Sequence, residues 1–212
     1  MSAKVITVAQ QKGGAGKTTL VAHLASLWSG ARKSVAVVDI DPQGSLAAWY
    51  AAREDRFGED DTGLTFSAVT GWRTANEVER LARDHDVVLV DSPPHAETEA
   101  KIAVRASSLV LVPVQPSPMD VWATRPTLAL AKGEKRQALL VLTRVPPRAR
   151  LTEAMLDEVK KFDAGVARSR VGNRVAFATT LLSGRGVSEA ASGSPAAKEM
   201  ANLAREVLRE AA

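Results

Sequence analysis

The sequence predicts a single α/β domain in which helices cover both faces of a mainly parallel β-sheet. Six apolar runs of strand length recur along its 212 residues, and segments of helical character separate them. Each run is apolar nearly throughout, which is typical of strands buried on both faces, and the alternation with helices indicates βαβ crossovers. The chain length and the 45% content of hydrophobic residues suit one domain with a full core.

The elements follow from these runs in order. We expect strands at 5–9, 35–40, 64–69, 87–91, 109–114 and 138–143. The predicted helices lie near 17–29, 44–56, 74–84, 97–107, 118–131, 151–162 and 195–211. The acidic stretch EDRFGEDDTG at 54–63 is interpreted as a surface loop. Because the first strand begins at residue 4 or 5, we take 1–212 as one domain without an N-terminal helix-turn-helix module.

The composition excludes several classes of protein. The chain has no cysteine, which rules out a disulfide framework, a thiolate zinc site and a cysteine-ligated iron–sulfur cluster. The N-terminal MSAKVITVAQ lacks the long apolar run of a signal peptide, and no window approaches the length of a membrane span. We therefore expect a cytoplasmic protein.

The net charge of +4 is unevenly distributed. Residues 1–106 carry 12 basic and 14 acidic side chains, whereas residues 107–212 carry 16 and 10. This excess of positive charge fits either an ordinary solvated surface or a face that binds a polyanion. The candidate basic residues are Arg168, Arg170 and Arg174, with no acid between them in sequence, and Lys198, Arg205 and Arg209, which can share a helix face.

A glycine-rich segment, QQKGGAGKTT at 10–19, joins the first predicted strand to the first predicted helix. Such a turn presents backbone N–H groups and a helix N-terminus to an anion, and phosphate is the expected ligand. The usual pattern G-x-x-x-x-G-K-[ST] requires glycine where this chain has Gln11, but its final Gly-Lys-Thr is intact. The expected nucleotide-binding residues are Gly13, Gly14, Ala15, Gly16, Lys17, Thr18 and Thr19, with Lys17 on the phosphates and the Thr18 hydroxyl on Mg²⁺.

A second lysine, Lys12, stands at the start of this segment. KGGAGKTT resembles the deviant Walker A motif of the ParA/MinD family of ATPases, which have a P-loop NTPase fold. The resemblance implies ATP and Mg²⁺ as cofactors and a homodimer in the ATP state, in which Lys12 reaches the partner's nucleotide. A cation supplied in trans would make hydrolysis conditional on dimerisation, and the comparable arginine finger is worth roughly 10³–10⁵ in rate. The alternative is a solvated loop lysine.

Carboxylates follow two of the buried strands. Asp39 and Asp41 end the second strand, where alternation would point both to the same side, and Asp91 ends the fourth strand in VVLVDSPP. Ligands of α/β sheets bind beyond the carboxyl ends of the strands, so these acids should face the Mg²⁺–phosphate region. The family resemblance implies that Asp41 positions the attacking water within a switch of Asp41, Pro42 and Gln43, that Asp39 lies in the outer shell of the metal, and that Asp91 holds the metal in the manner of Walker B.

Two later positions are less distinctive. LVLTR at 140–144 matches the family position next to adenine, which implies that Thr143 and Arg144 contact the base. Asp120, within PSPMD, could cap the helix that follows.

Several segments resemble the small, ParF-type branch of the ParA proteins: DPQGSLAAW, PVQPSPMD, LTR and SGRGVSEA. That resemblance implies a nucleoid-associated DNA-segregation ATPase. Its ATP-bound dimer would bind double-stranded DNA non-specifically, and a ParB/ParG-like adaptor would stimulate hydrolysis and release. The cargo stays open between a plasmid, a chromosome locus and another large assembly.

Three alternatives remain. A MinD-like protein would end in a membrane-binding amphipathic helix. The segment AAKEMANLAREVLREAA has balanced charge and an alanine-rich apolar face without Trp or Phe. We therefore expect this helix to pack against the domain, and we expect no stable membrane association. A dethiobiotin-synthetase-like ligase could use the same scaffold, although no substrate-binding constellation is visible. A nucleotide-dependent scaffold with negligible turnover is disfavoured by Lys17, Asp41 and Asp91.

Overall fold

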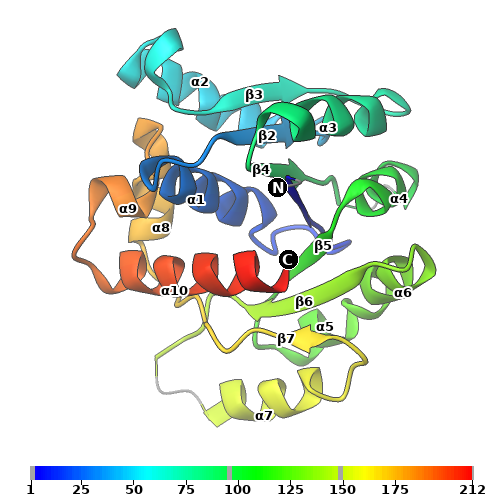
Figure 1. The fold of residues 1–212 in the computed structure, drawn as a ribbon. Coiled ribbons are helices and arrows are strands. Elements are labelled where there is room, and N and C mark those ends of the chain that lie inside the picture. The colour runs from blue at the N-terminus through cyan, green and yellow to red at the C-terminus, as the bar shows by residue number, and fades with distance from the viewer. Residues whose placement is uncertain (1–2, 95–96, 148–149, 212) are drawn as a thin grey trace.

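The computed structural model describes residues 3–94, 97–147 and 150–211 and has the predicted α/β architecture (Figure 1). The strands form one sheet in the order β3-β2-β4-β1-β5-β6-β7, and every neighbouring pair is parallel. Their bounds are β1 Lys4–Val8, β2 Val35–Asp39, β3 Thr65–Ala68, β4 Val87–Asp91, β5 Leu109–Val114, β6 Gln137–Leu142 and β7 Gly165–Val166.

Helices connect the strands and continue after the last one. The α-helices are α1 Lys17–Gly30, α2 Ser45–Phe57, α3 Arg73–Asp84, α4 Glu97–Ala106, α5 Pro118–Trp122, α6 Arg125–Gly133, α7 Arg150–Val159, α8 Ala176–Thr179, α9 Val187–Ala190 and α10 Pro195–Glu210. Two short 3₁₀ helices, η1 Glu59–Asp61 and η2 Leu181–Ser183, complete the described elements.

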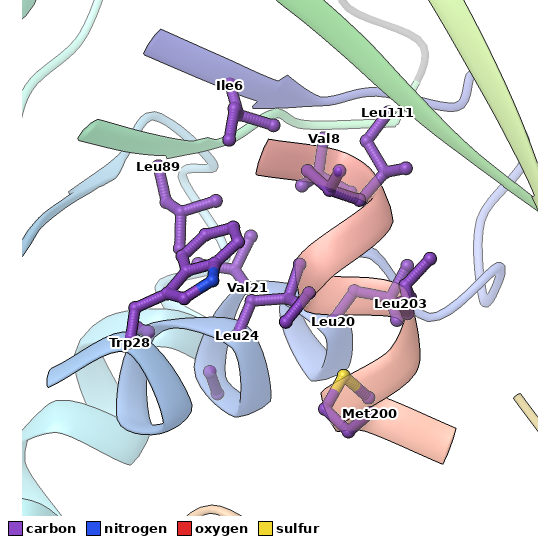
Figure 2. Packing of buried hydrophobic residues seen from close by; sticks show 14 of the residues in the cluster. Ile6, Val8, Leu20, Val21, Leu24, Trp28, Leu89, Leu111, Met200 and Leu203 are labelled. Atoms are coloured by element: carbon purple, nitrogen blue, oxygen red, sulfur yellow. The ribbon is translucent and has the colours of Figure 1, made fainter. Parts of the chain in front are cut away.

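The hydrophobic core lies on both faces of the sheet. On one face α1, α2 and α8–α10 cover the strands, and on the other face α3–α7 do so. Figure 2 shows Trp28 of α1 near Leu89 of β4, and Leu20 of α1 near Leu203 of α10, in one buried cluster. These strand residues are apolar on both faces because both faces are covered.

The C-terminal helix α10 packs onto this core, as its sequence predicted. Met200, Leu203 and Val207 are fully buried, and α10 lies alongside α1. The apolar stripe of α10 is therefore used inside the fold. Among the described residues, no helix is long and apolar enough to cross a bilayer.

The observed elements differ from the expectations in four respects. The helix expected at 118–131 is interrupted between α5 and α6. Pro126 lies in the first turn of α6, a position at which proline is tolerated, whereas proline inside a continuous helix would remove a backbone hydrogen bond. The stretch 54–63 is not an open loop, because α2 continues to Phe57, η1 follows, and Thr62 is buried. The two-residue strand β7 and the short helices after it were not predicted.

The fourth correction concerns the end of β2, which is Asp39 rather than residue 40. Asp41 therefore lies in the turn before α2, and strand alternation does not set its direction. The sheet register instead places Asp39 next to Asp91, and Asp91 next to Val8 of β1. The carboxyl ends of β1, β2 and β4 thus meet at the loop that follows β1.

Candidate nucleotide and magnesium site

The loop between β1 and α1 has the backbone of an anion-binding turn. Gly14 and Gly16 have positive φ angles of 74° and 92°, a region that glycine adopts without a steric penalty. Gly16 is the N-cap of α1 and supplies no side-chain hydrogen bond to the helix. The first N–H groups of α1 are consequently available to a phosphate.

Lys17 is largely buried in this loop, with 7% of its surface exposed. Its ammonium group donates a hydrogen bond to the carbonyl oxygen of Gln10 at 3.1 Å. Burial lowers the pKa of Lys17, while the negative charges of Asp91 and Asp41 oppose that shift. The cation is therefore held at the base of the loop by one neutral acceptor and two nearby acids.

Thr18 and Asp91 form the candidate metal site. The Thr18 hydroxyl donates to Oδ2 of Asp91 at 2.6 Å, and the buried Oδ1 of Asp91 has no hydrogen-bond partner within the described structure. Burial raises the pKa of Asp91 to about 7, and the charge of Asp39 acts in the same direction. A buried carboxylate oxygen without a partner, beside a hydroxyl, fits the oxygen ligands that Mg²⁺ prefers.

No group of three metal-ligating acids or histidines assembles within the described ranges. The protein thus offers few direct ligands, which is typical of Mg²⁺ sites where substrate phosphates and water supply the other oxygens.

The carboxylate of Asp39 holds the following turn. Its Oδ1 accepts from the backbone N–H of Asp41 and its Oδ2 from that of Ala47 in α2, each at 3.0 Å. Burial raises the pKa of Asp39, and these two hydrogen bonds partly offset the shift. Asp39 therefore ties the end of β2 to the first turn of α2, and its predicted outer-shell role at the metal stays a prediction.

The switch residues lie in that turn. Oδ1 of Asp41 accepts from the backbone N–H of Gln43 at 3.0 Å, and the N–H of Gly44 bonds the carbonyl oxygen of Asp41 at 2.9 Å. Pro42 and Gln43 are exposed, and Gly44 has a φ of 64°. Asp41 thus sits in a closed turn directly before α2.

Lys12 is paired within its own chain. Its ammonium group lies 2.8 Å from Oδ2 of Asp120, and 38% of the Lys12 side chain is exposed. The sequence suggested that Asp120 caps the helix that follows, but Ser117 is the N-cap of α5 and accepts a hydrogen bond from the backbone N–H of Asp120. The carboxylate of Asp120 instead interacts with the Ser117 hydroxyl and with Lys12.

Two hollows adjoin the loop. The larger, about 670 Å³, is lined by residues 13–19 together with Asp41, Gln43, Trp49, Arg144 and Leu182. The smaller, about 370 Å³, is lined by Gly16, Thr19, Thr143 and Arg144 and also by residues 171–175, Phe177 and Met200. Arg144, with a φ of 50°, borders both hollows, so the two predicted base-contacting residues lie beside the loop.

Sequence reasoning did not place the residues that follow β7 beside the loop, and it singled out Arg174 only as a candidate polyanion-binding residue. Asn173 and Arg174 line the smaller hollow together with Thr143, whose hydroxyl donates to the carbonyl oxygen of Ala15 at 3.4 Å. VGNRV at 171–175 contains no recognisable motif. Backbone hydrogen bonds between this segment and Val145, which follows β6, hold it beside the loop.

Some of the candidate polyanion-binding residues lie beside acids that are distant in sequence, and their predicted role in binding DNA stays a prediction. Arg170 pairs with Glu153 at 2.6 Å and Arg174 with Glu199 at 2.6 Å. Arg205 donates to Asn202, and Arg209 pairs with Glu210. Arg168, Lys198 and Arg205 are exposed and make no ion pair within the described residues.

Residues 6–187 match the model of the CobQ/CobB/MinD/ParA nucleotide binding domain. A maintenance of carboxysome distribution protein A from Halothiobacillus neapolitanus is 28% identical over 96% of this chain and 95% of its own length. A protein ParA from Rhizobium radiobacter is 31% identical over 70% of this chain and 68% of its own length.

Solved structures share the fold at low identity. The cell division protein MinD of Aquifex aeolicus has a TM-score of 0.80 at 21% identity, with 97% of each chain covered. An ATP complex of McdA from Cyanothece has a TM-score of 0.76 at 18% identity and covers 97% of this chain and 96% of its own. The seven-stranded sheet and its covering helices are therefore those of MinD and ParA proteins.

Proposed function

Because the chain belongs to the CobQ/CobB/MinD/ParA nucleotide-binding family, whose ParA and MinD members are positioning ATPases, we propose that it uses ATP to segregate or position a large cargo on DNA. ATP binding produces a sandwich dimer, the dimer binds DNA without sequence preference, and an adaptor protein stimulates hydrolysis and release. The single observation that carries this proposal is the loop itself, with Lys17 buried below an uncapped helix N-terminus and a second lysine at its start.

The chain's own residues divide the handling of Mg²⁺–ATP. The N–H groups of the loop and Lys17 bind the phosphates, Thr18 and Asp91 hold Mg²⁺, and Asp41 orients the attacking water. Bound Mg²⁺ supplies neutralising charge at the phosphate oxygens. The smaller hollow takes the base, because it opens beside the loop and offers the polar side chains of Thr143 and Asn173.

Lys12 acts on the nucleotide of the partner subunit in this proposal. Its ammonium group pairs with Asp120 of α5 and not with a residue of its own loop, and the exposed part of the side chain is accessible to a second molecule. Phosphoryl transfer is catalysed mainly by positioning and by cations that stabilise the developing charge. Hydrolysis would therefore depend on dimerisation.

DNA binding is assigned to the exposed cations after β7 and on α10. Arg168, Lys198 and Arg205 can contact phosphates directly, whereas Arg170 and Arg174 must first give up or share a carboxylate partner. Phosphate contacts are independent of sequence and release counterions, so binding should weaken steeply with salt.

The cargo is proposed to be a large protein assembly or a DNA molecule. The match to the carboxysome distribution protein spans nearly the whole of both chains, whereas the matched chromosome-partitioning protein Soj from Thermus thermophilus is covered over 54% of its length. This favours a protein assembly as cargo, with a plasmid or chromosome locus as the second candidate. The adaptor would be a ParB/ParG-like protein in function.

The test combines light scattering with binding to a random-sequence DNA duplex, in ADP and in a non-hydrolysable ATP analogue. We expect a dimer and salt-sensitive DNA binding only with the ATP analogue, and loss of hydrolysis but not of nucleotide binding in Lys12→Ala. A monomer in both states without DNA affinity would reject the proposal. Co-sedimentation with anionic liposomes that required residues 195–212 would instead support a MinD-like membrane function.

A further inference from the structure

Residues 184–189, which we call the wedge segment, lie between α1 and α2. A Cβ atom on Gly184 would stand 2.3 Å from the backbone nitrogen and Cα of Arg53 in α2. A Cβ atom on Gly186 would stand 2.3 Å from the hydroxyl oxygen of Ser26 in α1. The backbone of the wedge segment therefore touches both helices at positions where only glycine fits.

Arg53 of α2 is the main side chain that binds this segment. It is 4% exposed, and its guanidinium group donates to both carboxylate oxygens of Glu189, at 2.7 and 3.0 Å. The same group donates to the carbonyl oxygens of Thr62 at 2.7 Å and Gly184 at 3.0 Å and lies 4.7 Å from the ring centre of Phe57. All three guanidinium nitrogens of Arg53 therefore donate hydrogen bonds.

The other side of the wedge segment is bound to α1. The backbone N–H of Val187 donates to Nδ1 of His23 at 3.1 Å, and Nε2 of the same ring lies 2.9 Å from the carbonyl oxygen of Phe177. His23 is fully buried. Since α1 begins at Lys17, the wedge segment connects the helix of the phosphate-binding loop to α2.

The position of α2 matters because the switch turn is attached to its first residues. Asp41 and Ala47 share the carboxylate of Asp39 as hydrogen-bond acceptor, so the turn and the start of α2 form one unit. Leu181 and Leu182 also line the larger hollow, and only Ser183 separates them from the wedge segment. A shift of α2 relative to α1 would therefore move Asp41 relative to the loop.

We propose that Arg53 and Glu189 are a positioning pair for ATP hydrolysis, which fixes α2 against α1 and so sets the place of Asp41 at the nucleotide. The pair touches neither the larger hollow's phosphate-binding residues nor the reacting atoms and acts through α2. A buried ion pair is by itself weak evidence for a role in stability, because the cost of desolvation offsets much of the attraction. The attachment of the switch turn to α2 is the reason for assigning it a role in positioning. This inference rests on the proposed ATPase function.

The test is Glu189→Gln, which keeps the shape of the side chain and removes its charge. Single-turnover hydrolysis and nucleotide affinity are measured with Mg²⁺–ATP on the full chain, with the folded fraction checked by circular dichroism. We expect hydrolysis to slow by about tenfold or more, since small misplacements of a reacting group are costly, while the Kd for ATP changes by less than about threefold. Glu189→Asp, which keeps the charge, should recover part of the rate.

The control for loss of a carboxylate is Glu134→Gln, which breaks a two-point pair with the exposed side chain of Arg105 on the opposite face of the sheet, and it should leave hydrolysis unchanged. An unchanged rate in folded Glu189→Gln would overturn the proposal, as would an equal loss of rate and affinity. Failure of both Glu189 variants to fold would assign the pair to stability alone. If the wild-type chain hydrolyses no ATP, the proposed function itself fails.

Discussion

His23 gives the fold a pH dependence whose sign and size follow from its contacts. Nδ1 accepts a hydrogen bond from the N–H of Val187, and Nε2 must therefore donate to the carbonyl oxygen of Phe177, so the buried ring is neutral. Protonation would place a second N–H against that of Val187. Burial accordingly lowers the pKa of His23 from 6.5 to about 4, although its hydrogen bond to Phe177 and the charge of Glu189 oppose the shift.

The unfolded chain binds a proton at this residue below pH 6.5, whereas the folded chain does so only near pH 4. The free energy of unfolding is therefore not reduced by His23 at neutral pH, and it decreases as the pH falls from about 6.5 to about 4. With a shift of this size, the loss is about 2 kcal/mol at pH 5 and approaches about 3 kcal/mol at pH 4.

Urea unfolding of the wild type and of His23→Gln at pH 7.5 and pH 5 isolates this contribution, because other titrating groups are common to both proteins. At pH 7.5 the variant should be less stable, since two buried hydrogen bonds are altered. At pH 5 the difference between the two free energies of unfolding should shrink by about 2 kcal/mol. His85→Gln, at an imidazole that is half-buried and not in the core, controls for the general loss of a histidine. An unchanged difference between the two pH values would refute the reasoning.

Three further predictions concern the loop and the wedge segment. Asp91→Asn should stabilise the nucleotide-free protein at pH 8 by up to about 4 kcal/mol, because the raised folded-state pKa of Asp91 means that the wild type loses stability as the pH rises to about 7. The same change should weaken Mg²⁺-dependent ATP binding. Denaturant unfolding measures the stability and calorimetry the binding, and a variant less stable than the wild type at pH 8 would contradict the first expectation. Gly184→Ala should lower the melting temperature by several degrees because its Cβ would overlap the backbone of Arg53, and a wild-type melting temperature would show that the close approach is not needed. Asp120→Asn should lower the free energy of unfolding by under about 1 kcal/mol. By releasing Lys12 it should also shift the ATP-state monomer–dimer equilibrium toward dimer, which sedimentation would measure. Weaker dimerisation of the variant would show that Asp120 itself stabilises the dimer.

The strands, the phosphate-binding loop and Asp91 could be predicted because their signals are local. A run such as VVLVD is apolar enough to be a buried strand, and the acid at its end lies where ligands bind in parallel sheets. The order of strand, loop and acid along the chain is therefore enough to predict that Asp91 lies near Lys17.

The environment of Arg53 could not be predicted in this way. The acidic residues that follow it in sequence suggested an exposed loop, but its partners Glu189 and Gly184 lie more than 130 residues further along the chain. The pairing of Arg170 with Glu153 is likewise a long-range contact. The smaller hollow was missed for the same reason, since residues 171–175 form its wall only after β7 joins the sheet.

The order of the strands also limits how the molecule can associate with others. The two outer strands, β3 and β7, are only four and two residues long. Long open edges invite pairing with strands of another chain, and short ones offer few free N–H and C=O groups for it. Short outer strands therefore disfavour association through the sheet edges, and we expect any dimer or filament of this protein to be built from helices and loops.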